Sequence, residues 1–372
     1  MFISSLRTTA FRNLADAEVF TGVKEVFLIG ENGQGKTNFL EALYFCAYAS
    51  SFRTVRDSEL VRNSTTKSSE KDFSAAVKLA QSDHDEILVK HEKGKKSILI
   101  NGKPAEDRKE LLSVAPTIVF CHEDMEFVNG APERRRWFFD QTLSLYDPVY
   151  LDDFRRYRRV LKTRNSLLRD FAQRKTTDNP EPVLEALDPQ LVMYGLKLME
   201  KREAAVRDFS GVFSTLYEEV SGISGISAQY TQSWKNQTES EVLSHLQQRR
   251  TADMAAGLSL SGPHRDRYVF TQNAQTYGET DFTIKASTGQ KRLLALLLRT
   301  AQARRYSAMT GENPILLLDD VLLEMDGEKR RRFLSVMPAY KQAFFTFLPD
   351  EPYERYRKDD TLVYTVKDGQ VT

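Results

Sequence analysis

The sequence is poor in cysteine and has no excess of charge of either sign. Two cysteines, Cys46 and Cys121, stand among 372 residues, and their spacing to each other and to the five histidines matches no metal-binding pattern. We therefore expect two reduced, buried thiols in a cytosolic protein. The formal net charge is +1, so a nucleic-acid surface would have to arise from local clusters of basic residues.

Long apolar runs are also lacking. No stretch approaches the roughly 20 apolar residues that cross a bilayer, and the first residues, MFISSLRTTAFRN, alternate as a strand does and are unlike a signal peptide. These absences predict a cytoplasmic protein without a membrane partner. With 41% hydrophobic and 28% charged residues, the composition is that of a globular protein, and a length of 372 residues favours two packed units.

A glycine-rich stretch at residues 30–38, GENGQGKTN, fits the pattern G-x-x-x-x-G-K-[ST] of phosphate-binding loops. It follows an apolar strand at 26–29 and precedes helical spacing at 37–49, the order that such a loop requires. Its glycines let backbone N–H groups surround phosphate oxygens at a helix N-terminus. We expect Lys36 to meet the β- and γ-phosphates and Thr37 to ligate Mg²⁺. The predicted nucleotide-binding residues of this loop are Gly30, Glu31, Asn32, Gly33, Gln34, Gly35, Lys36 and Thr37.

A second apolar strand, PILLLDD at 314–320, ends in two carboxylates. We expect Asp319 to hold Mg²⁺ and Asp320 to orient or deprotonate the attacking water. A turn or helix-cap role is common for a single aspartate in this position. Two in tandem, in a chain that also carries the glycine loop, favour the nucleotide-hydrolysing interpretation.

Residues 287–292, STGQKR, resemble the S-x-G-Q signature of ABC-type ATPases. In those proteins the signature of one subunit contacts the γ-phosphate held by another. The resemblance implies that Ser287, Gly289 and Gln290 complete the site of a second copy of this chain. Taken alone, the motif is more often a helix N-cap. Residues 323–326 fall where ABC ATPases have their D-loop.

The remaining pattern predicts one α/β domain interrupted by helices. Residues 2–9 and 17–29 read as strands, as do three further segments, DFSAAVKLA, EILVKHE and KKSILI, the last closed by an Asn101-Gly102 turn. Helical periodicity covers 132–175 and 189–220 and predicts two long antiparallel helices that are joined by a breaker-rich loop. The expected fold is an ABC-type P-loop ATPase head with a mixed sheet (1–130 and 255–372) and an inserted, mainly α-helical lobe (131–254). The segment 348–372 carries no motif that we can interpret.

Several multi-residue blocks resemble the RecF family of bacterial DNA repair proteins, in order and over nearly the whole length. They are FRNL, SFRTVRDSELVR, FCHEDMEFVNGAPERRRWFFDQTL, LKTRNSLL and GPHRD. The resemblance implies a compact relative of the SMC-type ATPases with weak, DNA-stimulated ATPase activity, ATP and Mg²⁺ as cofactors, and an ATP-dependent homodimer that closes on DNA. It also implies action with RecR and RecO at single-stranded gaps or junctions, loading of the recombinase, and roles in replication-fork maintenance and the SOS response.

A basic stripe supports DNA contact. Residues 151–175 hold nine Lys or Arg against three Asp, and four of them, Arg155, Arg159, Lys162 and Arg169, fall near one helical face. Such a stripe can neutralise phosphates, although a solvated face with ion pairs is the commoner case. Arg134–Arg136 could serve DNA contact, packing of the lobe or the nucleotide. His264 and Arg265 could form a buried polar hinge or contact DNA. Arg12 and Asn13 are candidates for adenine contact by position only.

Other classes of nucleotide-binding protein fit less well. No N-K-x-D segment reads guanine, as a small GTPase would require. A structural SMC head with a long coiled coil would need a longer insert with extended heptads. An ABC- or SMC-like ATPase of a defence or chromosome-structure system is the main alternative, and the blocks outside the glycine loop argue against it.

Overall fold

The computed structural model describes residues 2–62, 72–105, 107, 109–175, 179–235, 237–272, 281–322, 325 and 327–372. The chain forms two compact units. Unit 1 contains Met1–Asp124 and Ala303–Thr372, and unit 2 contains Met125–Gln302. Each unit has a hydrophobic core of its own.

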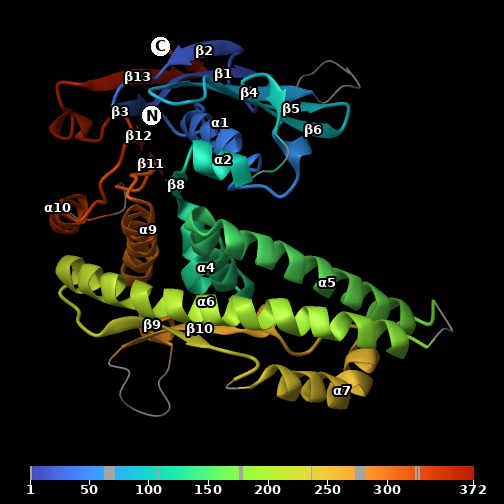
Figure 1. The fold of residues 1–372 in the computed structure, drawn as a ribbon. Coiled ribbons are helices and arrows are strands. Elements are labelled where there is room, and N and C mark those ends of the chain that lie inside the picture. The colour runs from blue at the N-terminus through green and yellow to red at the C-terminus, as the bar shows by residue number, and fades with distance from the viewer. Residues whose placement is uncertain are drawn as a thin grey trace. The chain divides into compact units, whose positions relative to one another are not determined.

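Unit 1 contains, within the described residues, two six-stranded sheets (Figure 1). In the first, with the order β2-β1-β4-β5-β6-β7, every pairing is antiparallel. In the second, with the order β14-β13-β3-β12-β11-β8, all pairings are parallel except that of β13 with β14. The strands are β1 (Phe2–Thr9), β2 (Ala17–Phe20), β3 (Glu25–Ile29), β4 (Phe73–Ala80), β5 (Glu86–Glu92), β6 (Lys95–Ile100), β7 (Lys103–Pro104), β8 (Thr117–Phe120), β11 (Ile315–Leu318), β12 (Gln342–Phe347), β13 (Thr361–Lys367) and β14 (Gln370–Val371).

Helix α1 (Lys36–Tyr48) packs between the two sheets. It contacts β1, β4 and β5 of one sheet and β8 and β12 of the other. Strand β3 is buried along its whole length, as its continuous apolar sequence predicts. The predicted turn between β6 and β7 is confirmed, because Asn101 and Gly102 both have positive φ. The shorter helices of unit 1 are η1 (Asp57–Glu59), α2 (Lys109–Val114), α10 (Gly327–Ser335) and η4 (Tyr353–Arg355).

Strand order sets the position of the site. The glycine loop leaves β3 at its carboxyl end, and the tandem aspartates follow the carboxyl end of β11. Because β12 lies between these parallel strands, all three end at the same edge of the sheet. This edge is where open parallel sheets bind ligands.

Unit 2 is built on three long helices, α4 (Pro132–Tyr146), α5 (Pro148–Ala172) and α6 (Glu181–Ser221). The prediction of one helix over 132–175 is wrong, because Asp147 caps α5 by accepting the Tyr150 N–H at 2.9 Å, and Pro148 follows it. Helix α6 begins well before the predicted residue 189 and runs through Pro189. Burial of its apolar face outweighs the cost of an internal proline.

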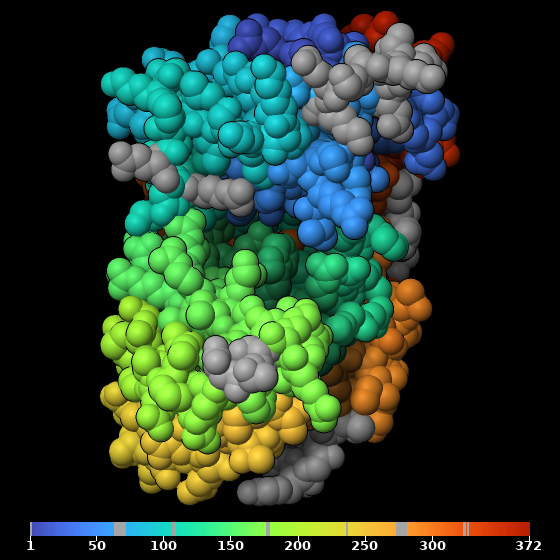
Figure 2. Space-filling view, turned by 90° about the vertical axis from the view of Figure 1, so that its right-hand side faces the viewer, coloured from blue at the N-terminus to red at the C-terminus, as the bar shows by residue number. Residues whose placement is uncertain are grey.

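The predicted domain boundary at residues 254/255 is also wrong. Strand β9 (Ile226–Thr231) pairs antiparallel with β10 (Arg267–Gln272), and α7 (Glu239–Ala256) packs on α5 and α6, so unit 2 continues to Gln302. Figure 2 views the end of the α5–α6 hairpin, with α7 (yellow) beside it. The other elements of unit 2 are η2 (His122–Met125), which begins before the boundary, α3 (Glu126–Asn129), η3 (Pro263–Arg265), α8 (Phe282–Lys285) and α9 (Thr288–Thr310), which continues into unit 1.

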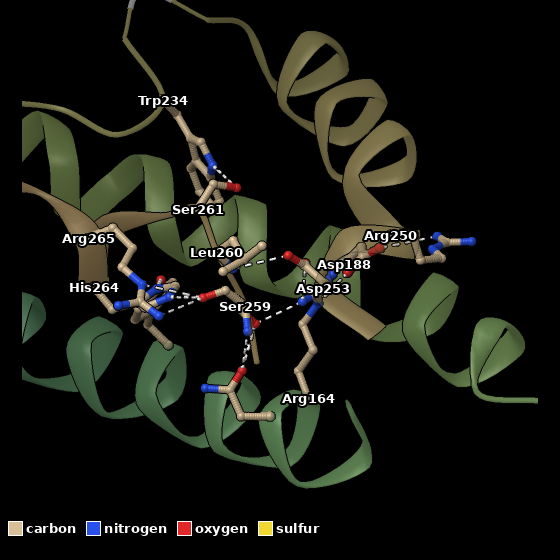
Figure 3. Close-up of polar contacts among 12 residues, drawn as sticks. Arg164, Asp188, Trp234, Arg250, Asp253, Ser259, Leu260, Ser261, His264 and Arg265 are labelled. Carbon is tan, nitrogen blue, oxygen red and sulfur yellow. Dashed lines mark hydrogen bonds and ion pairs between the residues drawn. The ribbon is translucent and has the colours of Figure 1, made fainter. Parts of the chain in front are cut away.

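Two buried arginines hold the helices of unit 2 together. Arg164 of α5 is fully buried and donates to Asp188 of α6 at 2.9 Å and to Asp253 of α7 at 2.8 Å (Figure 3). Arg202 of α6 binds Asp140 and Asp266 in the same way. Charges buried in pairs of this kind fix geometry more than they add stability, but loss of one partner leaves an uncompensated charge.

The turn that contains the GPHRD segment is part of this polar core. His264 lies between the Tyr157 hydroxyl, 2.7 Å from Nδ1, and the Ser259 carbonyl oxygen, 3.0 Å from Nε2 (Figure 3). A neutral ring satisfies both contacts, with Nε2–H donating and Nδ1 accepting. Burial, together with the neighbouring Arg265 and Arg136, lowers the pKa of His264 to about 4.

This pKa shift predicts that unit 2 loses stability as the pH falls. Below the unfolded-state pKa of about 6.5, His264 binds a proton in the unfolded chain but stays neutral in the folded chain. The unfolding free energy therefore falls with pH until the folded-state pKa of about 4 is reached. We expect the imidazole to contribute a decrease of up to about 2 kcal/mol in unfolding free energy between pH 7 and pH 5. In urea unfolding, the His264→Gln variant should lack this decrease in unfolding free energy between pH 7 and pH 5. His245→Gln, which changes a histidine on α7, is the control, and equal pH dependence in the two variants would contradict the assignment.

Candidate functional site

The glycine loop has the backbone geometry of a phosphate cradle. Gly33 and Gly35 have φ of +80° and +120°, a region that other residues rarely adopt. A Cβ on Gly30 would lie 2.3 Å from the carbonyl oxygen of Val366, so glycine is also needed there. Glu31, Asn32 and Gly33 are exposed, whereas Gly35 and Lys36 are buried where α1 begins. The loop therefore presents its backbone amides at a helix N-terminus.

Lys36 and Thr37 are the first two residues of α1 and lie beside the glycine loop. Lys36 Nζ folds back over the loop and donates to the carbonyl oxygens of Gly30 at 2.6 Å and Glu31 at 3.1 Å. Thr37 Oγ1 donates to Asp319 Oδ1 at 2.9 Å, across a sequence separation of 282 residues. The glycine loop and the second apolar strand therefore form one site.

The two aspartates after β11 share a single hydroxyl. Thr346 Oγ1, at the end of β12, accepts the Asp320 N–H at 2.7 Å and lies 3.2 Å from Asp319 Oδ1 and 3.0 Å from Asp320 Oδ1. Asp320 has φ of +50°, an unusual conformation for a residue other than glycine. Burial and the neighbouring Asp320 raise the pKa of Asp319 to about 7. A divalent cation would reverse that tendency and favour the ionised carboxylate.

Sequence reasoning missed Thr346. It is one of two polar residues in the strand QAFFTF, and it lies at the end where the strand meets the site. Its position follows from the register, because Leu318 pairs with Phe345 and the next residues on both strands are then neighbours. A polar residue at the carboxyl end of a buried parallel strand is the signal that could have found it.

Arg53 was also missed as a site residue. It lies in the SFRT block and lines the same cavity as the glycine loop. Its Nη1 donates to Asn38 Oδ1 at 3.0 Å, and its side chain is 36% exposed. A half-exposed guanidinium at the edge of a phosphate cradle is suited to an anion. Nothing in the local sequence indicates this, because the contact depends on the chain folding back after α1.

Arg12 and Asn13, which lie between β1 and β2, both bind other groups of the protein. Arg12 makes a two-pronged ion pair with the buried Glu41, with N–O distances of 2.9 and 3.0 Å. Asn13 Nδ2 donates to the Gly33 carbonyl oxygen at 3.2 Å, and its Oδ1 accepts from Asn38 at 2.7 Å. Arg12 therefore supports α1, and Asn13 supports the glycine loop.

The cavity over the loop fits part of a nucleotide and not all of it. It has a volume of about 190 Å³ and is lined by Glu31, Asn32, Gly33, Gly35, Lys36, Thr37, Asn38, Arg53 and Asp320. Pockets that enclose a whole small ligand are usually larger, from about 300 Å³. The donors suit a polyphosphate, and a hydroxyl beside a carboxylate suits Mg²⁺, which keeps several water and phosphate ligands. No group of three or more His, Cys, Asp or Glu side chains within the described residues forms a metal site of its own.

The signature segment caps α9. The Ser287 hydroxyl accepts the Gln290 N–H at 3.3 Å, and the Gln290 side chain accepts the Ser287 N–H at 2.7 Å, which is a capping box. Ser287, Thr288 and Gly289 are exposed on unit 2. The cap interpretation is thus correct, and the exposed helix N-terminus keeps its capacity for an anion. Leu323, Glu324 and Asp326 of the expected D-loop lie outside the described residues.

The four basic residues of α5 that were predicted to contact DNA differ in exposure. Arg159, Lys162 and Arg169 are exposed, whereas Arg155 is partly buried and contacts the protein. The nine basic residues of 151–175 also include Arg164, which is buried in the polar core.

The other two basic clusters serve mainly packing. Arg135 donates to Val128, Tyr268 and Asp281, and Arg136 donates to the Asp266 carbonyl oxygen. Arg134 is exposed and pairs with Glu126. His264 acts within the polar core, while Arg265 is exposed.

Within the described residues, every helix is too short or too polar to cross a bilayer.

Comparison with known proteins places these features in a family. Residues 2–370 match the model of the RecF/RecN/SMC N terminal domain. The chain is similar to "DNA replication and repair protein RecF" of Treponema pallidum, with 42% identity over 96% of this chain and 97% of that protein. It is also similar to the protein of that name from Bacillus subtilis, with 33% identity over 93% of each.

Solved structures agree with this result. One described as "the recombination mediator protein RecF-ATP in RecFOR pathway" aligns with a TM-score of 0.84 at 27% identity, covering 99% of this chain and 96% of that one. An SMC head bound to the C-winged helix domain of ScpA aligns with a TM-score of 0.53 at 17% identity over 100% of this chain and 96% of that one, and shows similarity of fold alone. The fold is therefore an α/β ABC-type ATPase head with added helices, and the chain belongs to the RecF family.

Proposed function

We propose that the chain is an ATP-dependent DNA-binding protein of replication and repair, in which ATP closes a homodimer on DNA and hydrolysis reopens it. The observation that carries the proposal is the contact between Thr37 and Asp319, which unites the glycine loop with the carboxylate strand. The ATP-bound structure of the similar protein RecF supports ATP as the nucleotide. The names of the relatives support replication and repair as the setting.

Each residue of the site has a role in hydrolysis on this proposal. Lys36 exchanges its contacts with loop carbonyls for the β- and γ-phosphates, while Thr37 and Asp319 hold Mg²⁺. The ion, when bound, supplies positive charge that offsets charge developing on the transferred phosphoryl group. Asp320 orients the attacking water and accepts its proton, and Thr346 fixes both carboxylates. Arg53 contacts the phosphate chain from the open side of the cavity.

The site is completed by a second copy of the chain. A single copy forms only a small, open cavity, and Ser287 with the N-terminus of α9 offers an exposed anion site on unit 2. In the proposed head-to-tail dimer, Ser287, Gly289 and Gln290 of one copy meet the γ-phosphate held by the other. ATP then acts as a ligand shared across the interface, so nucleotide and dimer stabilise each other.

DNA is bound through phosphates and not through bases. Arg159, Lys162 and Arg169 expose three cations on α5, and Arg155 of the predicted stripe would act only at its edge. We further propose single-stranded gaps or junctions as the target, a cytoplasmic location, and RecO and RecR as partners. The description of the similar structure as part of the RecFOR pathway supports these partners.

Lys36→Arg should retain nucleotide binding and lose most hydrolysis, because the larger planar guanidinium keeps the charge but cannot occupy the compact position of the ammonium. We expect turnover to fall at least about tenfold, a loss of about 1.4 kcal/mol of transition-state stabilisation. Binding of a fluorescent ATP analogue and phosphate release would measure the two effects. Lys24→Arg, at an exposed position of unit 1, is the matched control. Wild-type turnover in Lys36→Arg would contradict the role of Lys36.

Two variants should stop the dimer cycle in opposite states, one as a closed dimer and the other before closure. Asp320→Asn should trap a closed dimer, because water is no longer activated, and Ser287→Arg should prevent closure by placing a bulky side chain at the interface. Sedimentation with and without ATP measures both. Ser244→Arg, the same change at an exposed position of α7, should dimerise as the wild type does. Normal dimerisation of Ser287→Arg would refute the two-copy site.

Binding to gapped, duplex and single-stranded DNA should depend steeply on salt. Replacing Arg159, Lys162 and Arg169 with Ala should lower the log–log salt slope by about 0.9 for each duplex phosphate that is no longer neutralised. Removing three exposed cations outside α5, with Lys197→Ala, Arg207→Ala and Arg249→Ala, is the charge-matched control. If the wild-type chain bound no DNA at low salt, with or without ATP, the repair function would be wrong.

A further inference from the structure

The end of the chain contacts the glycine loop. Strand β13 pairs in parallel with β3, with Thr365 opposite Ile29, so the residues after Thr365 pass beside the loop as it leaves β3. The chain then turns back at residues 367–370, which we name the C-terminal turn, and β14 pairs with β13. Asp368 and Gly369 have φ of +47° and +78°, the conformation of a two-residue hairpin turn.

This turn makes two hydrogen bonds to one residue of the loop. The Asp368 N–H donates to Gln34 Oε1 at 2.7 Å, and the Gly369 N–H donates to the Gln34 carbonyl oxygen at 2.9 Å. The Gly369 carbonyl oxygen in turn accepts the Ala15 N–H at 2.9 Å. The turn therefore connects the glycine loop to the segment around Asn13, which itself binds Gly33.

Packing at the turn requires glycine. A Cβ on Gly369 would lie 1.8 Å from the carbonyl oxygen of Asn13 and 2.8 Å from its carbonyl carbon. Both are backbone atoms, so they cannot rotate away as a side chain would. An alanine at this position must displace either the C-terminal turn or residues 13–15, and the loop is bonded to both.

The geometry points to a role for the C-terminal turn in nucleotide affinity: Asp368 and Gly369 are positioning residues that hold the glycine loop in its phosphate-binding conformation before the nucleotide arrives. This inference rests on the proposed function. A loop with three glycines among its first six residues is costly to order. Contacts made before binding remove that cost from the binding step and strengthen affinity. They do not touch Asp320 or the attacking water, so the hydrolytic step is unaffected.

The test compares two variants with a matched control. Gly369→Ala combines a strained φ with the backbone clash, whereas Gly94→Ala in the β5–β6 turn, at φ of +75° and with nothing within 4 Å, carries the strain alone. Gln34→Ala removes only the side-chain acceptor, so it remains informative if Gly369→Ala fails to fold. Nucleotide affinity is measured with a fluorescent ATP analogue, turnover at saturating ATP, and protection of residues 30–36 by hydrogen exchange without nucleotide.

We expect ATP binding to weaken by about threefold to tenfold in Gln34→Ala, because one hydrogen bond is removed, and by at least about tenfold in Gly369→Ala. In Gly369→Ala, turnover at saturation should stay within about twofold of wild type, since one kcal/mol of barrier would already change it by about fivefold. Exchange of the loop should accelerate in both variants and not in Gly94→Ala. Unchanged affinity and protection in both folded variants, or a decrease confined to turnover, would overturn the inference.

Hydrogen exchange separates this inference from the proposed function. If the wild-type chain bound no nucleotide while the loop still became less protected in Gln34→Ala and Gly369→Ala, the proposed function would fail and the structural role of the turn would stand. If the wild type bound nucleotide and the variants bound it equally well, the role of the turn would fail and the proposed function would stand.

Discussion

The hydrogen bond between Thr37 and Asp319 is the contact on which the candidate site depends, because it joins two segments that are 282 residues apart in the sequence. It exists because β3 and β11 lie on either side of β12 in one parallel sheet, so both segments reach the same edge. Thr346, from the middle strand, then binds both aspartates. A sheet completed by both ends of the chain leaves the residues between free to form a separate unit, and unit 2 is that insertion.

In unit 2, buried ion pairs hold the long helices in fixed positions, while other charges of the same helices are exposed. Arg164 and Arg202 place guanidinium groups inside the helical core, each between two aspartates from other elements. Such pairs have a narrow range of allowed geometries, so they restrict how α5, α6 and α7 can slide past one another. The neighbouring cations of the same helix, Arg159, Lys162 and Arg169, are left in water. One basic helix thus divides its charges between internal order and the surface that we propose for DNA phosphates.

Much of the candidate nucleotide site could be predicted from the sequence because its signals are local. The order of strand, glycine loop and helix predicts Lys36 and Thr37, and the apolar run before Asp319 predicts a buried parallel strand. Thr346 and the C-terminal turn were not predicted, since each reaches the site through pairing of distant segments. Arg53 was not predicted because the chain brings it to the site only by folding back after α1. The Asp368-Gly369 pair is a hairpin signal in itself, but only its register with β3 places it beside the loop. The unit boundary was missed for the same reason, because the pairing of β9 with β10 decides it.

The helix-cap and anion-site interpretations of Ser287 are compatible, and this affects how a shared site can work. In the capping box the Ser287 oxygen accepts an N–H, and its own hydroxyl hydrogen stays available to a phosphate. The cap therefore orders the signature segment before a partner arrives, as the contacts from Asn13 and the C-terminal turn order the glycine loop. In the proposed dimer, two half-sites that each bind only part of a nucleotide gain most of their binding free energy when they meet around one. On the proposed function, ATP controls association because neither half binds it fully alone.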